Sequence, residues 1–285
     1  MHEIIHTLEH SFLDTLKIIP FLFIAFLIIE LIEHKLSTKS KKMITKSGKF
    51  GPIIGSLLGL IPQCGFSVVA TNLYITRIVS LGTLISIYLS TSDEMLIILL
   101  SKETPISTIL PLIAVKFFVG MISGFIIDFF LRNKRKDKVT YEICEDEHCG
   151  CEHEENLFKS SLIHTLKTAI FIFIATFVIT LAFEFFGEEY LSKIFLKDTL
   201  IAPFIASLIG LIPNCASSVI LTELYLSGAI NFASVISGLL TGSGVAILVL
   251  FKTNKNIKEN LTILGLIYGI GVFVGIIITL ISYIF

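Results

Sequence analysis

Long apolar stretches and short polar segments alternate along the whole chain. Stretches of roughly 20 apolar residues, the length that a membrane-spanning helix needs, lie at 15–33, 79–100, 105–131, 161–183, 230–250 and 261–285. Two further apolar stretches, at 51–76 and 200–226, are broken near their middle by Pro, an amide residue and Cys. The pattern predicts an all-α polytopic membrane protein, multi-pass in the cell membrane, with the lipid bilayer as a partner.

Composition supports the same class. Of the 285 residues, 54% are hydrophobic and only 16% are charged, which is too apolar for a water-soluble domain. The N-terminal segment MHEIIHTLEHSF carries acids and histidines where a secretory signal would carry basic residues. We therefore expect 15–33 to be a retained helix, and we expect no nucleic acid among the partners.

The two broken stretches are near copies of each other. SLLGLIPQCGFSVVATNLY at 56–74 and SLIGLIPNCASSVILTELY at 207–225 are identical at 12 of 19 positions, at a constant spacing of 151 residues. We therefore predict an N-terminal transmembrane repeat at 1–135, a cytoplasmic linker rich in Cys, His and acids at 136–156, and a C-terminal transmembrane repeat at 157–285.

The positions of Lys and Arg predict how the repeats face. The basic loops at 35–49 and 132–138 should be cytoplasmic, and the acidic segment at 184–198 should be external. An even number of crossings must separate the two cytoplasmic loops, so the stretch at 51–76 must enter and leave on the same side. The same argument makes 200–226 a hairpin that enters from outside. The prediction is two inverted-topology repeats, each with a re-entrant helical hairpin.

The broken stretches also predict where a site lies. Pro62 lacks an N–H and clashes with the preceding helical turn, so the first hairpin must bend there. Each hairpin arm has about 11 residues, near 16 Å, and reaches only about halfway across a core of roughly 30 Å. The transmembrane helix after each hairpin should be interrupted too, at 90–94 and 241–244, because Ser, Thr and Gly clusters can unwind a helix and offer oxygen ligands. The predicted substrate site lies between the two tips and the two interruptions and consists of Gln63, Cys64, Ser67, Ser90, Thr91, Ser92, Asp93, Asn214, Cys215, Ser218, Thr241 and Ser243.

Four charged residues lie well inside apolar stretches: Asp93, Glu94, Lys116 and Glu223. Each such charge costs about 2.5–3.5 kcal/mol on insertion scales, so intramembrane charges normally face a cavity or a partner. The repeats differ here, since Glu223 aligns with Asn72. We predict that these four residues couple transport to a proton or cation; in the alternative, Lys116 only neutralises a neighbouring carboxylate.

The linker carries a second candidate site. Cys144, His148, Cys149, Cys151 and His153 lie within ten positions of one another among acids. Thiolate and imidazole suit zinc, copper(I) or thiophilic metalloids, and the spacing matches no structural zinc finger. We predict that this loop captures or senses a metal ion transiently; the alternative is a solvated acidic linker.

At LIPQCGFSVVATNLY and its repeat LIPNCASSVILTELY, the chain resembles the ten-helix heavy-metal exporter family, whose members are also labelled arsenic efflux proteins or manganese transporters. The resemblance covers essentially the whole chain, and counting each hairpin arm separately gives the family's ten apolar segments. The layout is also similar to the wider ion-transporter superfamily, whose repeats each hold a hairpin and an unwound helix. The resemblance implies a membrane transporter of metal ions.

The resulting hypothesis is a secondary transporter that exports a thiophilic metal or metalloid such as arsenite. A divalent cation such as manganese is the alternative substrate, for which carboxylate and amide oxygens would be the better ligands. An intramembrane enzyme is a different class, disfavoured because His-Glu-x-x-His is absent, and no Gly-x-x-x-x-Gly-Lys-Ser/Thr motif supports ATP hydrolysis. We expect no required cofactor, and a homo-oligomer is compatible with the sequence.

Overall fold

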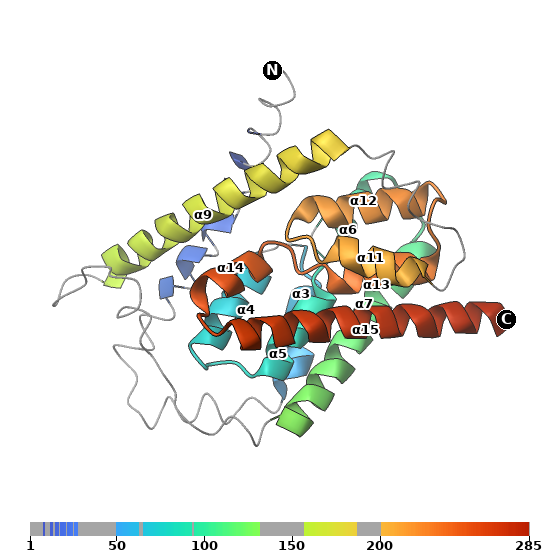
Figure 1. The fold of residues 1–285 in the computed structure, drawn as a ribbon, viewed down its shortest axis with the longest axis horizontal. Coiled ribbons are helices and arrows are strands. Elements are labelled where there is room, and N and C mark those ends of the chain that lie inside the picture. The colour runs from blue at the N-terminus through green and yellow to red at the C-terminus, as the bar shows by residue number, and fades with distance from the viewer. Residues whose placement is uncertain are drawn as a thin grey trace.

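The computed structural model of the protein describes residues 50–62, 65–92, 94–131, 157–186 and 201–284, with scattered positions between 8 and 27. This part of the chain consists of helices joined by turns, without a strand (Figure 1). The helices are α3 (Gly51–Gly59), α4 (Gly65–Ile75), α5 (Leu81–Ser90), α6 (Met95–Ser101), α7 (Ile106–Leu131), α9 (Leu157–Phe186), α11 (Ala202–Gly210), α12 (Cys215–Leu226), α13 (Phe232–Thr241), α14 (Ala246–Thr253) and α15 (Ile257–Ile284).

Within the described ranges, five helical segments are long and apolar enough to cross a membrane: Leu81–Ser101, Ile106–Phe130, Ser161–Val178, Phe232–Thr253 and Ile257–Ile284. They confirm five of the six predicted membrane-spanning stretches. The sixth, at 15–33, lies largely outside the described residues. The outer surface carries many exposed Leu, Ile and Phe side chains, as a lipid-facing surface requires.

Equivalent positions of the two halves make equivalent contacts. A Cβ added to Gly59 of α3 would collide with the Ser90 side chain of α5, and one added to Gly210 of α11 would collide with Thr241 of α13. Gly59 and Gly210 are equivalent positions of the sequence repeat, and so are Ser90 and Thr241. The short side chains let α3 approach α5, and α11 approach α13, backbone to backbone.

The third helix of each half joins the same close packing. Gly124 of α7 lies against Pro52 and Ser86, and Gly275 of α15 lies against Pro203 and Ser237. A Cβ at Gly124 would come within 2.9 Å of both neighbours. These contacts again recur at the spacing of the sequence repeat, so α3–α5–α7 and α11–α13–α15 form two similar three-helix units.

The turns that join α4 to α5 and α12 to α13 repeat as well. Arg77 has φ +63°, and Gly228, its equivalent in the second half, has φ +73°. Gly adopts this left-handed conformation easily, whereas Arg is strained in it. The two halves therefore share the geometry of the turn although the residue at this position differs. Ser80 then caps α5 by accepting from the Thr83 N–H at 3.1 Å, and Asn231 caps α13 at the equivalent position.

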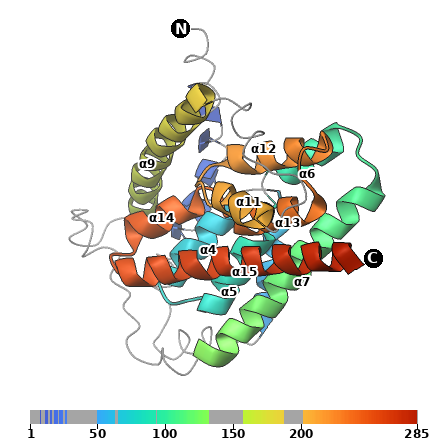
Figure 2. The ribbon, with the colours of Figure 1, turned by 45° about the vertical axis from the view of Figure 1, so that its right-hand side comes forward.

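The two halves exchange contacts through their short helices. Helix α4 of the first half packs on α14 of the second, and α12 of the second packs on α6 of the first. Helices α5 and α13 also touch across the centre. In Figure 2, α15 runs toward the labelled C-terminus on the right, whereas α7 runs from the right toward the lower left. The helices that end the two halves therefore point in opposing general directions.

Candidate functional site

Both apolar stretches with a central Pro are broken as predicted. Helix α3 ends at Gly59 and α4 starts at Gly65, while α11 ends at Gly210 and α12 starts at Cys215. Pro62 and Pro213 lie in the two breaks, where a missing N–H costs no helical hydrogen bond. Each break joins one C-terminal helix end to one N-terminal helix end.

The structure details the break between α11 and α12. Asn214 is buried and caps α12, since its Oδ1 accepts from the Ala216 N–H at 3.4 Å. The next residue, Cys215, is a buried cysteine in the first turn of α12. Helix N-termini carry partial positive charge, which favours a thiolate there. The corresponding residues of the first tip, Gln63 and Cys64, lie outside the described residues.

Both predicted helix interruptions are present. Helix α5 ends at Ser90 and the chain resumes as α6 at Met95; α13 ends at Thr241 and resumes as α14 at Ala246. In the first interruption, the Ser92 N–H donates to the Gly59 carbonyl oxygen at 3.1 Å. That bond joins the interruption after α5 to the C-terminal end of α3, so the break after α3 and the helix interruption meet in the first half.

The predicted ligand residues that the structure describes are all buried. They are Ser67, Ser90, Thr91, Ser92, Asn214, Cys215, Ser218, Thr241 and Ser243. Several hydroxyls donate to a carbonyl of the preceding helical turn, as Ser90 does to Ser86 and Ser218 does to Cys215. Such a hydroxyl still has lone pairs for a cation. Ser243 differs, because its buried Oγ has no hydrogen-bond partner among the described residues.

The four predicted coupling residues have different surroundings. Lys116 of α7 is 1% exposed and its Nζ donates to the Leu239 carbonyl oxygen of α13. Glu94 is partly buried at the start of α6. Glu223 pairs with Lys102, and both side chains are exposed by 40% or more. Asp93 lies outside the described residues.

The Glu223–Lys102 pair also orients two helices. Glu223 lies in the last turn of α12 and Lys102 directly follows α6. Since α12 and α6 pack on each other and their C-terminal ends meet, the two helices run in the same direction. Their N-terminal ends, with Cys215 on α12 and Glu94 on α6, therefore point toward the same end. The break between α11 and α12 and the interruption between α5 and α6 therefore lie at the same end of this helix pair.

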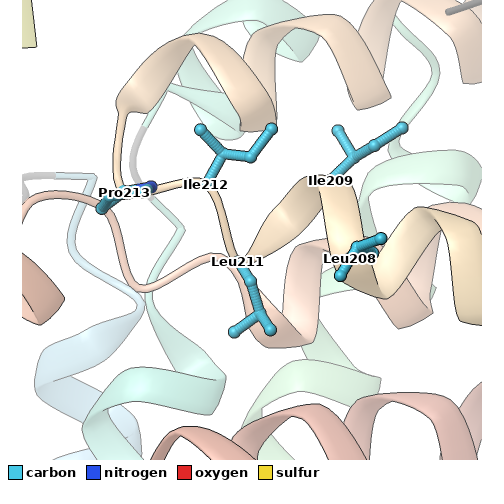
Figure 3. A pocket seen from close by; sticks show the side chains of 5 residues that line it. All are labelled: Leu208, Ile209, Leu211, Ile212 and Pro213. Atoms are coloured by element: carbon cyan, nitrogen blue, oxygen red, sulfur yellow. The ribbon is translucent and has the colours of Figure 1, made fainter. Parts of the chain in front are cut away.

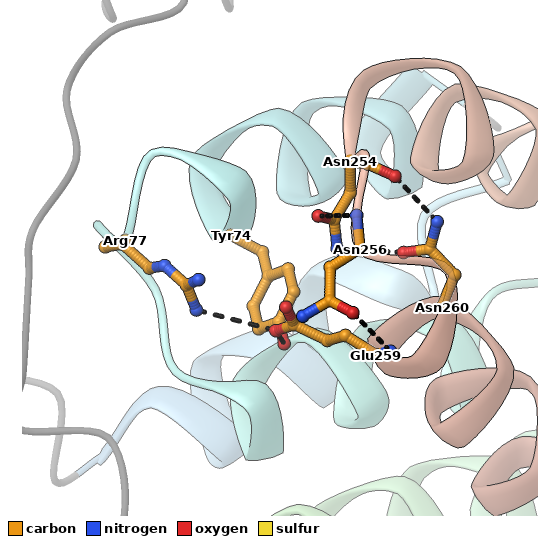
Figure 4. Close-up of polar contacts among 6 residues, drawn as sticks. All are labelled: Tyr74, Arg77, Asn254, Asn256, Glu259 and Asn260. Carbon is orange, nitrogen blue, oxygen red and sulfur yellow. Dashed lines mark hydrogen bonds and ion pairs between the residues drawn. The ribbon is translucent and has the colours of Figure 1, made fainter.

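A polar cluster at the start of α15 has no counterpart among the residues predicted from the sequence (Figure 4). The Tyr74 hydroxyl donates to Glu259 Oε1 at 2.5 Å, and Arg77 Nη1 lies 3.5 Å from the same oxygen. Asn254 and Asn260 bond to each other beside them. The cluster joins α4 of the first half to α15 of the second. No local sequence pattern could predict this cluster, because Tyr74 and Glu259 are far apart along the chain.

Asn72 is a further residue that the sequence did not single out. Its side chain is 1% exposed, and within the described part of the chain neither its amide nitrogen nor its amide oxygen has a hydrogen-bond partner. It is the position that aligns with Glu223. A buried amide without partners costs free energy, which makes Asn72 a candidate for mutagenesis.

A hollow of about 410 Å³ lies beside the second hairpin and is lined by Leu208, Ile209, Leu211, Ile212 and Pro213 (Figure 3). These side chains carry no polar atom. The hollow therefore offers no side-chain ligand for a metal ion, and its Leu208 belongs to the exposed apolar surface.

The predicted metal loop, with Cys144, His148, Cys149, Cys151 and His153, lies outside the described residues. Among the residues that are described, no group of three or more His, Cys, Asp and Glu could hold a metal ion. The loop therefore stays a prediction.

Comparison with known protein families gives a match. The model of a protein family described as “Putative, 10TM heavy-metal exporter” matches residues 1–188 and 168–283. No curated protein and no solved structure matches the chain significantly. The two matched segments together span both halves of the chain and the linker.

Proposed function

The chain belongs to the family of ten-helix heavy-metal exporters, and from that premise we propose that it exports a thiophilic metal or metalloid species, such as arsenite. Membership of this family, together with the five long apolar helices, makes the chain a multi-pass membrane transporter for heavy metal. A transporter family of this kind is not an enzyme class. The proposal concerns the substrate, the site and the way the two halves face.

We place the two halves in the membrane as inverted repeats. Three observations support this arrangement: the contacts that recur at the spacing of the sequence repeat, the opposing directions of α7 and α15, and the basic loops at 35–49 and 132–138. The breaks after α3 and α11 then become the tips of re-entrant hairpins. Their arms, each of nine to twelve residues, are too short to cross the bilayer.

The proposed substrate site lies where the two tips meet the two helix interruptions. Eight short helices have an end at one of these breaks, and helix N-termini favour anions while C-termini favour cations. The observation that carries the soft-ligand proposal is Cys215, a buried cysteine in the first turn of α12, at the same end of the α6–α12 pair as Glu94. Cys64, at the equivalent position of the first half, supplies the second thiol.

The alternative substrate is a divalent cation such as manganese. It is favoured by the number of buried oxygens at the interruptions, including those of Ser92 and Ser243, and by the amides of Gln63 and Asn214. Carboxylates at Asp93 and Glu94 would complete an oxygen site and exchange the coupling proton. In both versions the linker cysteines deliver metal to the transporter and are not part of the central site.

The deciding experiment removes the thiols and keeps their size. Cells that lack their own exporter should carry the wild-type chain, Cys64→Ser, Cys215→Ser or the double variant, and be grown on arsenite, manganese, zinc and copper. If the substrate is thiophilic, each single variant loses most of the resistance and the double variant loses all of it. The matched control is the triple variant Cys144→Ser, Cys149→Ser, Cys151→Ser, which removes thiols outside the site and should leave partial resistance. Full arsenite resistance with the double variant would replace the proposal with the divalent-cation alternative.

A further inference from the structure

Lys116 is the most deeply buried cation among the described residues. It lies in the middle of α7, is 1% exposed, and belongs to a segment long and apolar enough to span the membrane. A lysine at that depth is retained only where it has a partner or a task. Its neighbour is the second half of the molecule, since its Nζ donates to the Leu239 carbonyl oxygen.

Leu239 lies in the last turn of α13, where the helix is interrupted. In a continuing helix its carbonyl oxygen would accept from the N–H of Ser243, but α13 ends at Thr241. The Gly242 N–H donates to the carbonyl oxygen of Gly238, the residue before Leu239. The Lys116 ammonium therefore caps a carbonyl that the interruption has freed, at the negative end of the helix dipole.

The other half lacks this cation at the equivalent position. The repeat aligns Lys116 with Ile267, which is fully buried in α15. It aligns Leu239 with Tyr88, whose carbonyl oxygen accepts from the Thr91 N–H at 3.4 Å. The two helix interruptions lie at equivalent positions of the sequence repeat, but within the described chain only the second receives a lysine from this position.

In transporters built from broken helices, the carbonyls at the C-terminal end of a half-helix are where a coupling Na⁺ binds. Resting on the proposed transport function, we propose that the Lys116 ammonium occupies this cation position at the end of α13, so that the exporter carries its own fixed cation there and works without Na⁺. Lys116 is then the residue that decides the coupling ion. The Ser243 hydroxyl, buried in the same interruption with no partner among the described residues, is the remaining oxygen that a metal ion could use after the lysine is removed.

The test uses purified full-length protein in detergent and two variants. Lys116→Ala removes the cation and opens space, whereas Lys116→Met removes the charge but keeps the volume. Thermal unfolding is followed by circular dichroism, because the chain has no Trp. Sodium, n-propylammonium and choline chlorides are compared at equal ionic strength. Arsenite uptake into inside-out proteoliposomes is measured in the same three salts.

The proposal expects the wild-type melting temperature and transport to be the same in sodium and choline. Lys116→Ala should melt lower and transport poorly in choline, and should regain both properties in sodium or n-propylammonium. Lys116→Met should stay folded, lose transport and respond to none of the salts. This pattern separates a required cation from a side chain that only fills space.

Two results would overturn the proposal: sodium-dependent stability or transport in the wild type, or transport by Lys116→Met at the wild-type level. Should Lys116→Ala not be recovered as folded protein, the wild-type and Lys116→Met measurements still decide. The melting experiment contains no arsenite. A sodium response of Lys116→Ala together with no arsenite transport by the wild type would therefore contradict the proposed substrate and support the cation position.

Discussion

Lys102 of the first half forms an ion pair with Glu223 of the second half, where the C-terminal ends of α6 and α12 meet. A second contact between the halves, Arg77 with Glu259, lies where α4 meets the start of α15. In the proposed topology, the first pair lies on the outer side and the second on the cytoplasmic side. The halves are thus linked by an ion pair on each side of the central site.

The first prediction concerns the Lys102–Glu223 pair. Lys102→Glu should bring two carboxylates together, and Lys102→Glu with Glu223→Lys should restore the attraction. Because both side chains are exposed, we expect a coupling free energy of only about 0.2–1 kcal/mol in thermal unfolding. Lys258→Glu, at an exposed position of α15, is the control for a charge reversal away from this pair. A double variant no more stable than Lys102→Glu alone would show that the pair does not join α6 to α12.

The second prediction tests the topology at Lys102 of the first pair and at Lys258, the residue next to Glu259 of the second pair. Single cysteines at Lys102 and Lys258, in a chain whose own cysteines are replaced by Ser, should react with a membrane-impermeant maleimide from opposite sides. Lys102→Cys should be labelled in intact cells, together with cysteines introduced at 184–198. Lys258→Cys should be labelled only in inverted vesicles, together with cysteines at 35–49. Labelling of both positions from one side would contradict the inverted arrangement.

The third prediction concerns the close approach of α3 and α5. A Cβ at Gly59 would lie 2.7 Å from the Ile87 carbonyl oxygen, which cannot move without moving α5. We expect Gly59→Ala to lower the free energy of unfolding by about 1–3 kcal/mol, the usual cost of overpacking. Gly265 of α15 is the matched control, since a Cβ there meets nothing within 4 Å. Gly265→Ala should raise stability by up to about 1 kcal/mol, because Ala is the better helix former. Equal effects of the two changes would mean that α3 and α5 are not in this contact.

Much of the fold could be predicted because it depends on local chemistry. Pro62 and Pro213 lie in the breaks directly after α3 and α11, and the Ser, Thr and Gly clusters after Ser90 and Thr241 interrupt the next helices at the predicted places. The constant spacing of the sequence repeat pairs Gly59 with Gly210, and in the structure the two glycines make similar contacts. These features depend on residues close in sequence or related by the duplication.

The contacts between the halves could not be predicted in the same way. Arg77, Lys102 and Glu259 differ from the residues at their equivalent positions, so the duplication carries no information about their partners. The partner of Lys116 is a backbone carbonyl, which any residue at position 239 would supply. The sequence shows that Asn72 lies within an apolar stretch, but it does not show whether the amide side chain is hydrogen-bonded in the fold. Only the packing of α4 distinguishes the two cases.

The last prediction concerns that amide. Asn72 is buried in α4, where neither side-chain polar atom has a hydrogen-bond partner in the described structure, and an unmet buried polar group costs about 1–3 kcal/mol. Asn72→Leu keeps the branched shape and the number of heavy atoms of the side chain but removes its polar atoms, so it should raise the free energy of unfolding by up to about that amount. If the amide is kept for the passage of a hydrated or ionic substrate, the same change should lower transport while the protein becomes more stable. Thr76→Val is the matched control nearby: the Thr76 hydroxyl is already bonded to the Asn72 and Leu73 carbonyls, so its loss should not raise stability. Melting temperature and proteoliposome transport of both variants would decide, and a more stable Asn72→Leu variant with unchanged transport would assign the amide no part in the passage.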